Sequence, residues 1–397
     1  MDNKNRIYFD NAATTPVRKE VFDEIRPYFT ELYGNASSIY EIAHQSQKAM
    51  EKARRQVASA IGARDSEIFF TAGGSESDNW AIKGVADALS NKGKHIITTK
   101  IEHHAVLHTC EFLEKHGYDV TYLPVDEYGL VSVDELKNAL RPDTILISVM
   151  FANNEIGTIE PVAEIGKIAR EHGIYFHTDA VQAVGHVNIN VNDMNIDLLS
   201  MSGHKLGAPK GIGALYIRSG VKISNLIHGG GQEKGKRAGT ENIPGIVGLG
   251  KAIELAVSEI DTENERLIKM RDRIIESITS SISHSRLNGH PEKRLPGNVN
   301  ISFEFIEGEG MLLLLDNKGI SASSGSACTS GSLDPSHVLL SIGLPHEKAH
   351  GSLRLTLSRN NTMEEVEYFL KEIGPIVERL RQMSPLYEEF IKNNRAV

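Results

Sequence analysis

The chain has 397 residues, enough for two or three domains with a large core. Its formal net charge of −9 argues against nucleic acid or an anionic membrane as the main partner, and its apolar content of 40% is ordinary for a globular protein. No signal peptide is expected at the amino terminus, and the apolar run at 311–315 is too short to span a bilayer. Two cysteines argue against a disulfide framework, so we expect a cytoplasmic protein.

Short apolar runs alternate with helical patterns between about residues 65 and 220. The runs that we interpret as buried strands are 67–71, 94–99, 144–150, 174–176, 197–200 and 214–217. The first run leads through a glycine turn into a helical pattern at 78–89. Strands separated by helices in this way indicate βαβ units on a mostly parallel sheet.

The second half of the chain has a different pattern. A glycine-rich segment at 228–239 interrupts the alternation, and an amphipathic stretch at about 245–282 predicts a long helix that leaves the first domain. Strand patterns at 298–303 and 353–357 then mix with helices, the last of which opens with a capping box at 362–365. We therefore expect a second, smaller α+β domain.

Asp179 ends one strand-like run, and Lys205 ends the next strand-like run along the chain. Ligands of parallel sheets usually bind at the edge where such strands end. Pyridoxal phosphate requires this pair of groups, a lysine amine for a Schiff base and an acid that keeps the pyridine nitrogen protonated. From these two residues alone, a surface lysine and a helix-capping aspartate remain an open alternative.

Polar groups also follow other strand-like runs. The glycine turn at 72–78 offers backbone N–H groups and the Ser75 hydroxyl to a phosphate, although a tight turn with a serine N-cap has the same pattern. An imidazole at His103 suits proton transfer over a pyridine ring, although isolated histidines are more often structural. Asn154 follows the run at 144–150, and Gln182 lies three positions after Asp179. Five strand ends thus offer groups suited to one phosphorylated aromatic cofactor.

The segment 321–332 surrounds one thiol, Cys328, with Ser, Ala, Gly and Thr. Small residues leave a backbone mobile, so we interpret the segment as a swinging loop that carries a nucleophile. A free thiol has a pKa of about 8.5, so attack requires activation by positive groups or a base. The alternative is a loop in which the cysteine is a small filler. Cys110 lies on a helical pattern and is expected in the core.

Two further motifs have competing interpretations. Arg354 lies in a strand pattern between apolar neighbours, where a guanidinium suits bidentate capture of a carboxylate, but an ordinary edge-strand arginine fits as well. The sequence 346–350 matches the H-E-x-x-H zinc pattern. Pro345 and Gly351 leave little more than one helical turn between them, so no metal site is expected.

Taken together, these motifs resemble the cysteine desulfurases of the NifS/IscS type, a group of the class V aminotransferase family with the pyridoxal-phosphate fold type I. The resemblance extends from Tyr8 to about Arg359 and matches group I, whose cysteine loop is long. The matching segments are 8–16, 74–77, 102–103, 153–157, 179–182, 202–205, 237–240, 324–328 and 352–354.

The resemblance implies an α/β fold with a large domain that binds pyridoxal phosphate at 15–260. A smaller α+β domain, formed by 1–14 and 261–397, would carry the mobile cysteine loop at about 321–335. In the family, a threonine that matches Thr240 reaches the cofactor phosphate of the neighbouring subunit. A homodimer with composite sites is therefore implied.

The same resemblance assigns roles around the cofactor. Lys205 would form the Schiff base and Asp179 would contact the pyridine nitrogen. Gln182 would hydrogen-bond the phenolic oxygen, and His103 would stack on the ring and share proton transfers. The residues implied at the phosphate are Gly74, Ser75, Ser202 and His204.

Arg354 and Asn154 would bind the substrate carboxylate, and Asn154 would also contact the cofactor. The implied reaction converts L-cysteine to L-alanine, with the sulfur captured on Cys328 as a persulfide. A sulfur-acceptor or scaffold protein would then take it, for iron–sulfur cluster assembly or for tRNA or cofactor thiolation. The alternatives are a selenocysteine lyase or an aminotransferase of the same fold, and, in another class, a non-catalytic scaffold for iron–sulfur assembly.

Overall fold

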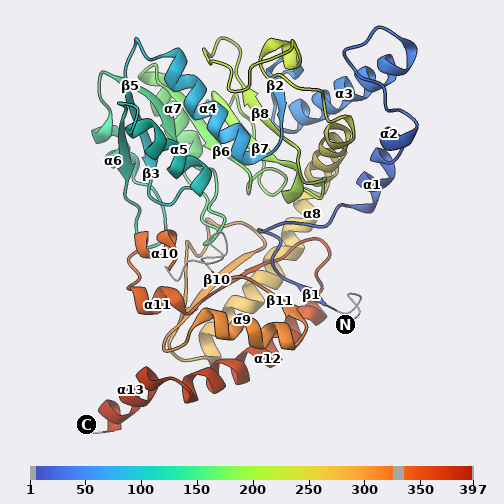
Figure 1. Ribbon diagram of the computed structural model, residues 1–397. Helices are drawn as coiled ribbons and strands as arrows, with labels where there is room; N and C mark the ends of the chain where they lie inside the picture. The colour runs from blue at the N-terminus through green and yellow to red at the C-terminus, as the bar shows by residue number, and fades with distance from the viewer. Residues whose placement is uncertain (1–5, 325–334, 396–397) are drawn as a thin grey trace.

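The computed structural model describes residues 6–324 and 335–395. Two halves, each with its own apolar core, are joined by the long helix α8 (Ile243–Ser281) (Figure 1). Cys328, the expected sulfur-binding residue, lies outside the described residues.

The upper half in Figure 1 is built on a seven-stranded sheet. In spatial order its strands are β2 (Ile68–Thr71), β8 (Gly213–Ile217), β7 (Leu198–Ser202), β6 (Tyr175–Asp179), β5 (Thr144–Ser148), β3 (His95–Thr99) and β4 (Asp119–Leu123). In this sheet β8 alone runs antiparallel to its neighbours. The prediction of a mostly parallel sheet is therefore confirmed, and β4 is an edge strand that the sequence analysis did not identify.

Helices cover both faces of this sheet because side chains alternate along each strand. Phe69 and Ile96 face one helical layer, whereas the next residues, Phe70 and Ile97, face the other. The first layer contains α4 (Gly74–Ala88) and α5 (His104–Glu114). The second contains α1 (Lys19–Ile25), α3 (Glu41–Ala60), α6 (Val133–Ala139), α7 (Val162–Glu171) and the first part of α8, and the short α2 (Pro27–Thr30) follows α1.

The lower half combines small sheets with helices. Its antiparallel sheet has the order β12 (Ser352–Thr356), β10 (Asn298–Phe303) and β9 (Ser285–Leu287). The other elements are β1 (Ile7–Tyr8), which pairs in parallel with β11 (Ile320–Ser321), α9 (Gly308–Asn317), α10 (His337–Ser341), α11 (His346–His350), α12 (Met363–Gln382) and α13 (Pro385–Arg395). The H-E-x-x-H sequence thus forms a helix of only five residues.

Helix α8 belongs to both cores. It has 39 residues, or a length of about 58 Å at the usual rise per residue. Ile246 and Ile253 pack in the core of the upper half, and Leu267 and Ile278 pack in the core of the lower half. Phe9 also packs in the lower core. These contacts support the domain division that we propose, 15–260 for the large domain and 1–14 with 261–397 for the small one.

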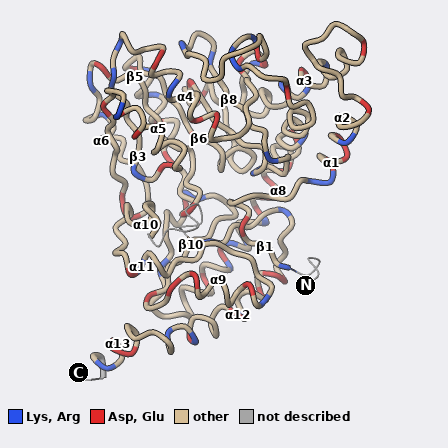
Figure 2. Tube along the Cα trace, in the orientation of Figure 1, with Lys and Arg blue, Asp and Glu red and all other residues tan. Residues whose placement is uncertain are grey.

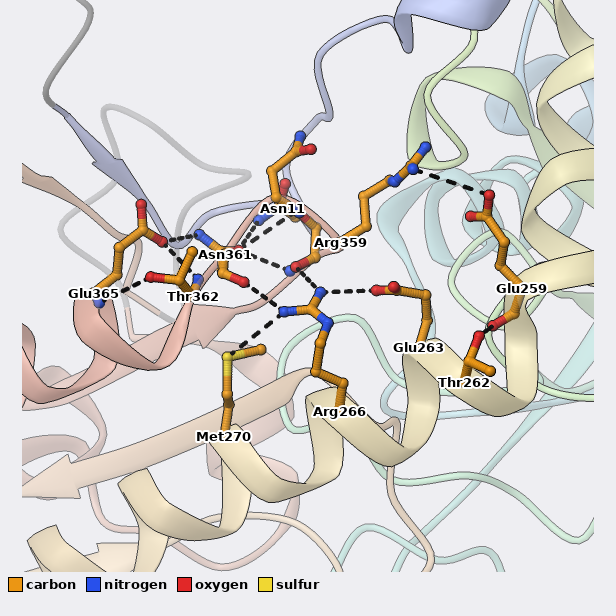
Figure 3. Close-up of polar contacts among 12 residues, drawn as sticks. Asn11, Glu259, Thr262, Glu263, Arg266, Met270, Arg359, Asn361, Thr362 and Glu365 are labelled. Atoms are coloured by element: carbon orange, nitrogen blue, oxygen red, sulfur yellow. Dashed lines mark hydrogen bonds and ion pairs between the residues drawn. The ribbon is translucent and has the colours of Figure 1, made fainter.

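Polar contacts fasten the amino-terminal segment to α8 and to the chain after β12 (Figure 3). Arg266 of α8 donates to the carbonyl of Asn361 at 2.5 Å and pairs with Glu263 at 2.8 Å. Asn361 in turn donates from its side chain to the carbonyl of Tyr8 at 3.0 Å and accepts from Asn11 at 3.4 Å. These contacts therefore fasten the segment that contains Asn11 to the lower half of the molecule.

Basic and acidic residues are interspersed over both halves (Figure 2). Several of them form ion pairs at the surface. Arg141, for example, contacts Asp119 at 3.1 Å and Asp143 at 2.9 Å. Within the described ranges, the helices are all too short or too polar to cross a bilayer.

Candidate active site

Lys205 follows the carboxyl end of β7, at the end of a single 3₁₀ turn (Gly203–Lys205). Its Nζ donates to the carbonyl oxygens of Ala12 and Ala13, the latter at 2.8 Å. Gln182, in the turn after β6, donates from Nε2 to the same carbonyl of Ala12 at 3.1 Å. Lys205 and Gln182 therefore share one acceptor, the carbonyl oxygen of Ala12 in the amino-terminal segment. Sequence reasoning missed this contact because backbone carbonyls leave no residue-specific signal.

Asp179 is the last residue of β6 and is only 6% exposed. Its Oδ1 accepts a hydrogen bond from the backbone N–H of Val181 at 2.9 Å. Burial raises the pKa of this carboxyl, and His103, the Val181 N–H and Lys205 oppose that shift. Since β6 and β7 are parallel neighbours, Asp179 and Lys205 lie at the same edge of the sheet, as the sequence predicted.

His103 caps the amino terminus of α5, where its Nδ1 accepts from the backbone N–H of Ala105 at 3.1 Å. Burial is the main cause that lowers the pKa of His103, and the positive charge of Lys205 lowers it further, against the effect of Asp179. A neutral His103 with Nδ1 as acceptor carries its proton on Nε2. The cap therefore fixes both the ring and its tautomer.

A third buried group, Asp78 of α4, lies beside these two residues. Atoms of Asp78, His103 and Asp179 lie within 4.8 Å of one another. In residues 6–324 and 335–395 they are the one group of three with the spacing of metal ligands. The sequence analysis assigned no role to Asp78, although a charged residue on the buried face of α4 was a visible signal.

The glycine turn before α4 lies close to Ser202 and Val181. A Cβ atom on Gly74 would lie 2.7 Å from Cγ2 of Val181, so glycine allows the backbone to approach this closely. The helix begins at Gly74 rather than at residue 78, and its N-cap is Gly73 rather than a serine. Ser75 is exposed in the first turn. Free N–H groups at this helix start favour an anion.

His204 and Thr240 also have defined positions. Nδ1 of His204 lies 3.1 Å from Oγ1 of Thr14. Burial, together with Lys205 and Lys210, lowers the pKa of His204 to about 4, so the ring is neutral at pH 7. Thr240 is exposed in the segment before α8, and none of the contacts described above involves it.

Arg354 lies on β12, an edge strand of its sheet, but its side chain is only 2% exposed. It donates to Oδ1 of Asp10 at 2.9 Å and to the carbonyl of Asn154 at 3.3 Å. Its Nε has no hydrogen-bond partner within the described part of the chain. Asn153 shapes the turn that carries Asn154, because its Oδ1 accepts the N–H of Glu155 at 2.8 Å. Asp10 is a second residue that the sequence analysis missed.

Residues on both sides of the undescribed segment contact this site. Ser323 donates to Asp10 at 3.2 Å, and Ser336 donates to Oε2 of Glu155. Burial raises the pKa of Glu155 to about 7. The chain therefore leaves and re-enters the described structure beside Arg354 and Asn154.

Known proteins of one family share this fold and sequence. The family described as Aminotransferase class-V matches residues 7–369. A cysteine desulfurase IscS from Methanosarcina thermophila is 64% identical over 380 residues, which cover 96% of this chain and 94% of that protein.

Solved structures agree with the sequence relatives. A NifS-like protein has a TM-score of 0.89 and 40% identity, and the match covers 94% of this chain and 100% of that chain. A structure of SspA in complex with cysteine has a TM-score of 0.79 and 41% identity, with 88% and 98% covered. The chain belongs to the class-V aminotransferase family and, within it, to the cysteine desulfurases. The resemblance and the α/β fold expected from the sequence are both confirmed.

Proposed function

We propose that this enzyme uses pyridoxal phosphate to convert L-cysteine to L-alanine and transfers the sulfur to Cys328 as a persulfide. The observation that carries the proposal is the position of Lys205 and Asp179 at the ends of two adjacent parallel strands. The similar SspA structure is a complex with cysteine, which supports this choice of substrate.

The groups around Lys205 fit the proposed cofactor. When bound, pyridoxal phosphate supplies a ring that withdraws electrons from the substrate Cα. The start of α4, with Gly74, Ser75 and nearby Ser202, suits its phosphate. Asp179 suits its protonated nitrogen, because a buried carboxylate stabilises an adjacent positive charge.

The remaining site residues hold or move protons. The Lys205 amine is the proposed base that takes the proton from the substrate Cα. Neutral His103 is proposed to stack on the ring, with its Nε2–H available for transfer. Gln182, held at the carbonyl of Ala12, is proposed to orient the phenolic oxygen, and His204 to donate to the phosphate.

Arg354 and Asn154 are the proposed ligands of the substrate carboxylate. Two N–H groups of a guanidinium match two carboxylate oxygens. The Cys328 thiolate is proposed to attack the substrate sulfur, so that an S–S bond forms as the S–Cβ bond breaks. The electron pair of the broken bond remains on the carbon framework, which is protonated to alanine.

We further propose a homodimer in which Thr240 of one subunit reaches the phosphate site of the other. The exposure of Thr240 supports this role. The persulfide would pass to a sulfur-acceptor or scaffold protein, and the cytoplasm is the proposed location.

A comparison of the two cysteines tests the central proposal. Cys328→Ala should abolish release of sulfide and alanine but keep the absorbance of the bound cofactor, because the cofactor contacts remain. Cys110→Ala is the matched control, since Cys110 is fully buried in α5 and should be dispensable. Continued conversion of cysteine to alanine by Cys328→Ala would refute the role of Cys328.

The rival functions predict other outcomes. An aminotransferase would need a keto acid, so alanine and sulfide formed without one exclude it. A selenocysteine lyase would show a much larger kcat/KM for selenocysteine than for cysteine. A non-catalytic scaffold would purify without cofactor, and Lys205→Ala would leave its absorbance unchanged.

A further inference from the structure

Asp78 is a buried acid for which the proposed reaction has no role. It lies on α4, one helical turn after Gly74, and is 1% exposed. Its Oδ1 has no hydrogen-bond partner among the described residues, and the nearest ring nitrogen, Nε2 of His177, is 3.6 Å away. An ionised carboxylate oxygen in such a position lacks the donors that normally stabilise it.

Among the described residues, the groups that shift the pKa of Asp78 include no lysine or arginine. His177 of β6 is held between two hydroxyls, Ser148 at 2.8 Å and Ser200 at 3.0 Å, and burial lowers the pKa of His177 to about 3. The ring is therefore neutral. Lys205 directs its Nζ at the carbonyls of Ala12 and Ala13.

The other titratable groups described around Asp78 are acids or neutral imidazole rings. Glu102 is fully buried and its pKa is raised to about 8 by burial. The pKa of His103 is lowered, chiefly by burial. Asp179 is the described acid whose charge acts most strongly on Asp78, ahead of Glu102.

The hydrogen bonds distinguish the two acids. Asp179 receives the N–H of Val181 at 2.9 Å, whereas Oδ1 of Asp78 receives no donor in the described structure. Two buried carboxyl groups this close cannot both ionise readily, and the one with the backbone donor is the better anion. Burial and the charge of Asp179 both raise the pKa of Asp78, and only the Ser200 hydroxyl opposes them.

We propose that Asp78 is a positioning residue that stays protonated, so that Asp179 alone carries the negative charge for the cofactor nitrogen. The single negative charge of Asp179 would then match the single positive charge of the protonated cofactor nitrogen. A second anion would instead add repulsion toward the phosphate and toward Asp179. This inference rests on the proposed use of pyridoxal phosphate.

Infrared spectroscopy tests the proton directly. Protein labelled with ¹³C at the aspartate carboxyl carbon should show a protonated-aspartate band at pH 7, separate from the bands of unlabelled buried glutamates such as Glu102. The band should persist in Asp179→Asn and vanish in Asp78→Asn. A band that vanishes in Asp179→Asn and persists in Asp78→Asn would overturn the proposal. So would the absence of any such band in the labelled wild type, a measurement that requires no variant.

Cofactor binding to the apoprotein supplies an independent measurement. Asn mimics a protonated Asp, so Asp78→Asn should bind pyridoxal phosphate within about threefold of wild type between about pH 6 and 7.5. Asp179→Asn should bind at least about tenfold more weakly, because a charge-assisted hydrogen bond is lost. A tenfold loss in folded Asp78→Asn would show that Asp78 acts as an anion. If neither protein, nor the wild type, binds pyridoxal phosphate, the proposed function itself fails.

Discussion

Replacing Arg354 with lysine should selectively weaken the binding of L-cysteine. Arg354 already donates one hydrogen bond to Asp10 and one to the carbonyl of Asn154, and its Nε remains without a partner in the described structure. A guanidinium can keep these contacts and still offer N–H groups to a substrate carboxylate. The ammonium of a lysine has three donors, so at least one charge-assisted hydrogen bond is lost.

The expected fall in kcat/KM follows from the loss of one hydrogen bond to the substrate carboxylate. One hydrogen bond to a charged group contributes about 1.5–3 kcal/mol, so kcat/KM for cysteine should fall roughly 10- to 150-fold. Alanine formation at several cysteine concentrations measures this value, and the absorbance of the bound cofactor should not change. The matched control is Arg359→Lys, because Arg359 is partly exposed and its acidic partners are 3.8 and 3.9 Å away. If kcat/KM of Arg354→Lys stays within about twofold of wild type, Arg354 does not bind the substrate carboxylate.

Three further changes test other parts of the structure. Gly74→Val should weaken pyridoxal phosphate binding by at least about tenfold in a dialysis titration, since its Cβ would lie 2.7 Å from Val181; unchanged affinity would exclude this turn as the phosphate site. Arg266→Ala should lower the free energy of unfolding in urea by about 1–3 kcal/mol, because the carbonyl of Asn361 loses its donor, and a loss below about 0.5 kcal/mol would contradict this. The pKa of Glu160 is raised to about 8, chiefly by burial, so the folded state binds a proton that the unfolded state releases near its usual pKa of 4.5. Wild type should therefore lose up to about 1.4 kcal/mol of stability per pH unit, relative to Glu160→Gln, as the pH rises from about 5 to 8; parallel urea stability profiles would refute this.

The strands of the large sheet were predictable because both of their faces are buried. Strands buried on both faces read as short, nearly continuous apolar runs, and the run at 144–148 has this pattern. The sequence analysis did not predict the edge strand β4, because this strand begins with an exposed aspartate and is mostly half-buried. It therefore lacks the continuous apolar run of the central strands. The start of α4 was placed four residues late because its first turn consists of Gly and Ser, which sequence patterns assign to loops.

The sequence by itself predicted which residues make up the proposed site. Asp179 ends a strand, and Lys205, Gln182 and His103 follow strands, all within one run of βαβ units. Parallel strands bring their carboxyl ends to one edge of the sheet. Order along the chain therefore predicted their proximity in space.

Only the tertiary structure decided what surrounds these groups. Asp10 and Arg354 are 344 positions apart, and the carbonyl of Ala12 meets Lys205 across 193 positions. Contacts of this kind depend on how the two halves pack, which no local pattern encodes. The same holds for Asp78: α4 packs against β6 and β7, and the Oδ1 of Asp78 has no donor among the described residues. Residue types thus specify which reactions are possible, whereas burial and packing decide the surroundings of Asp78 and Asp179, from which the proposed protonation of Asp78 is argued.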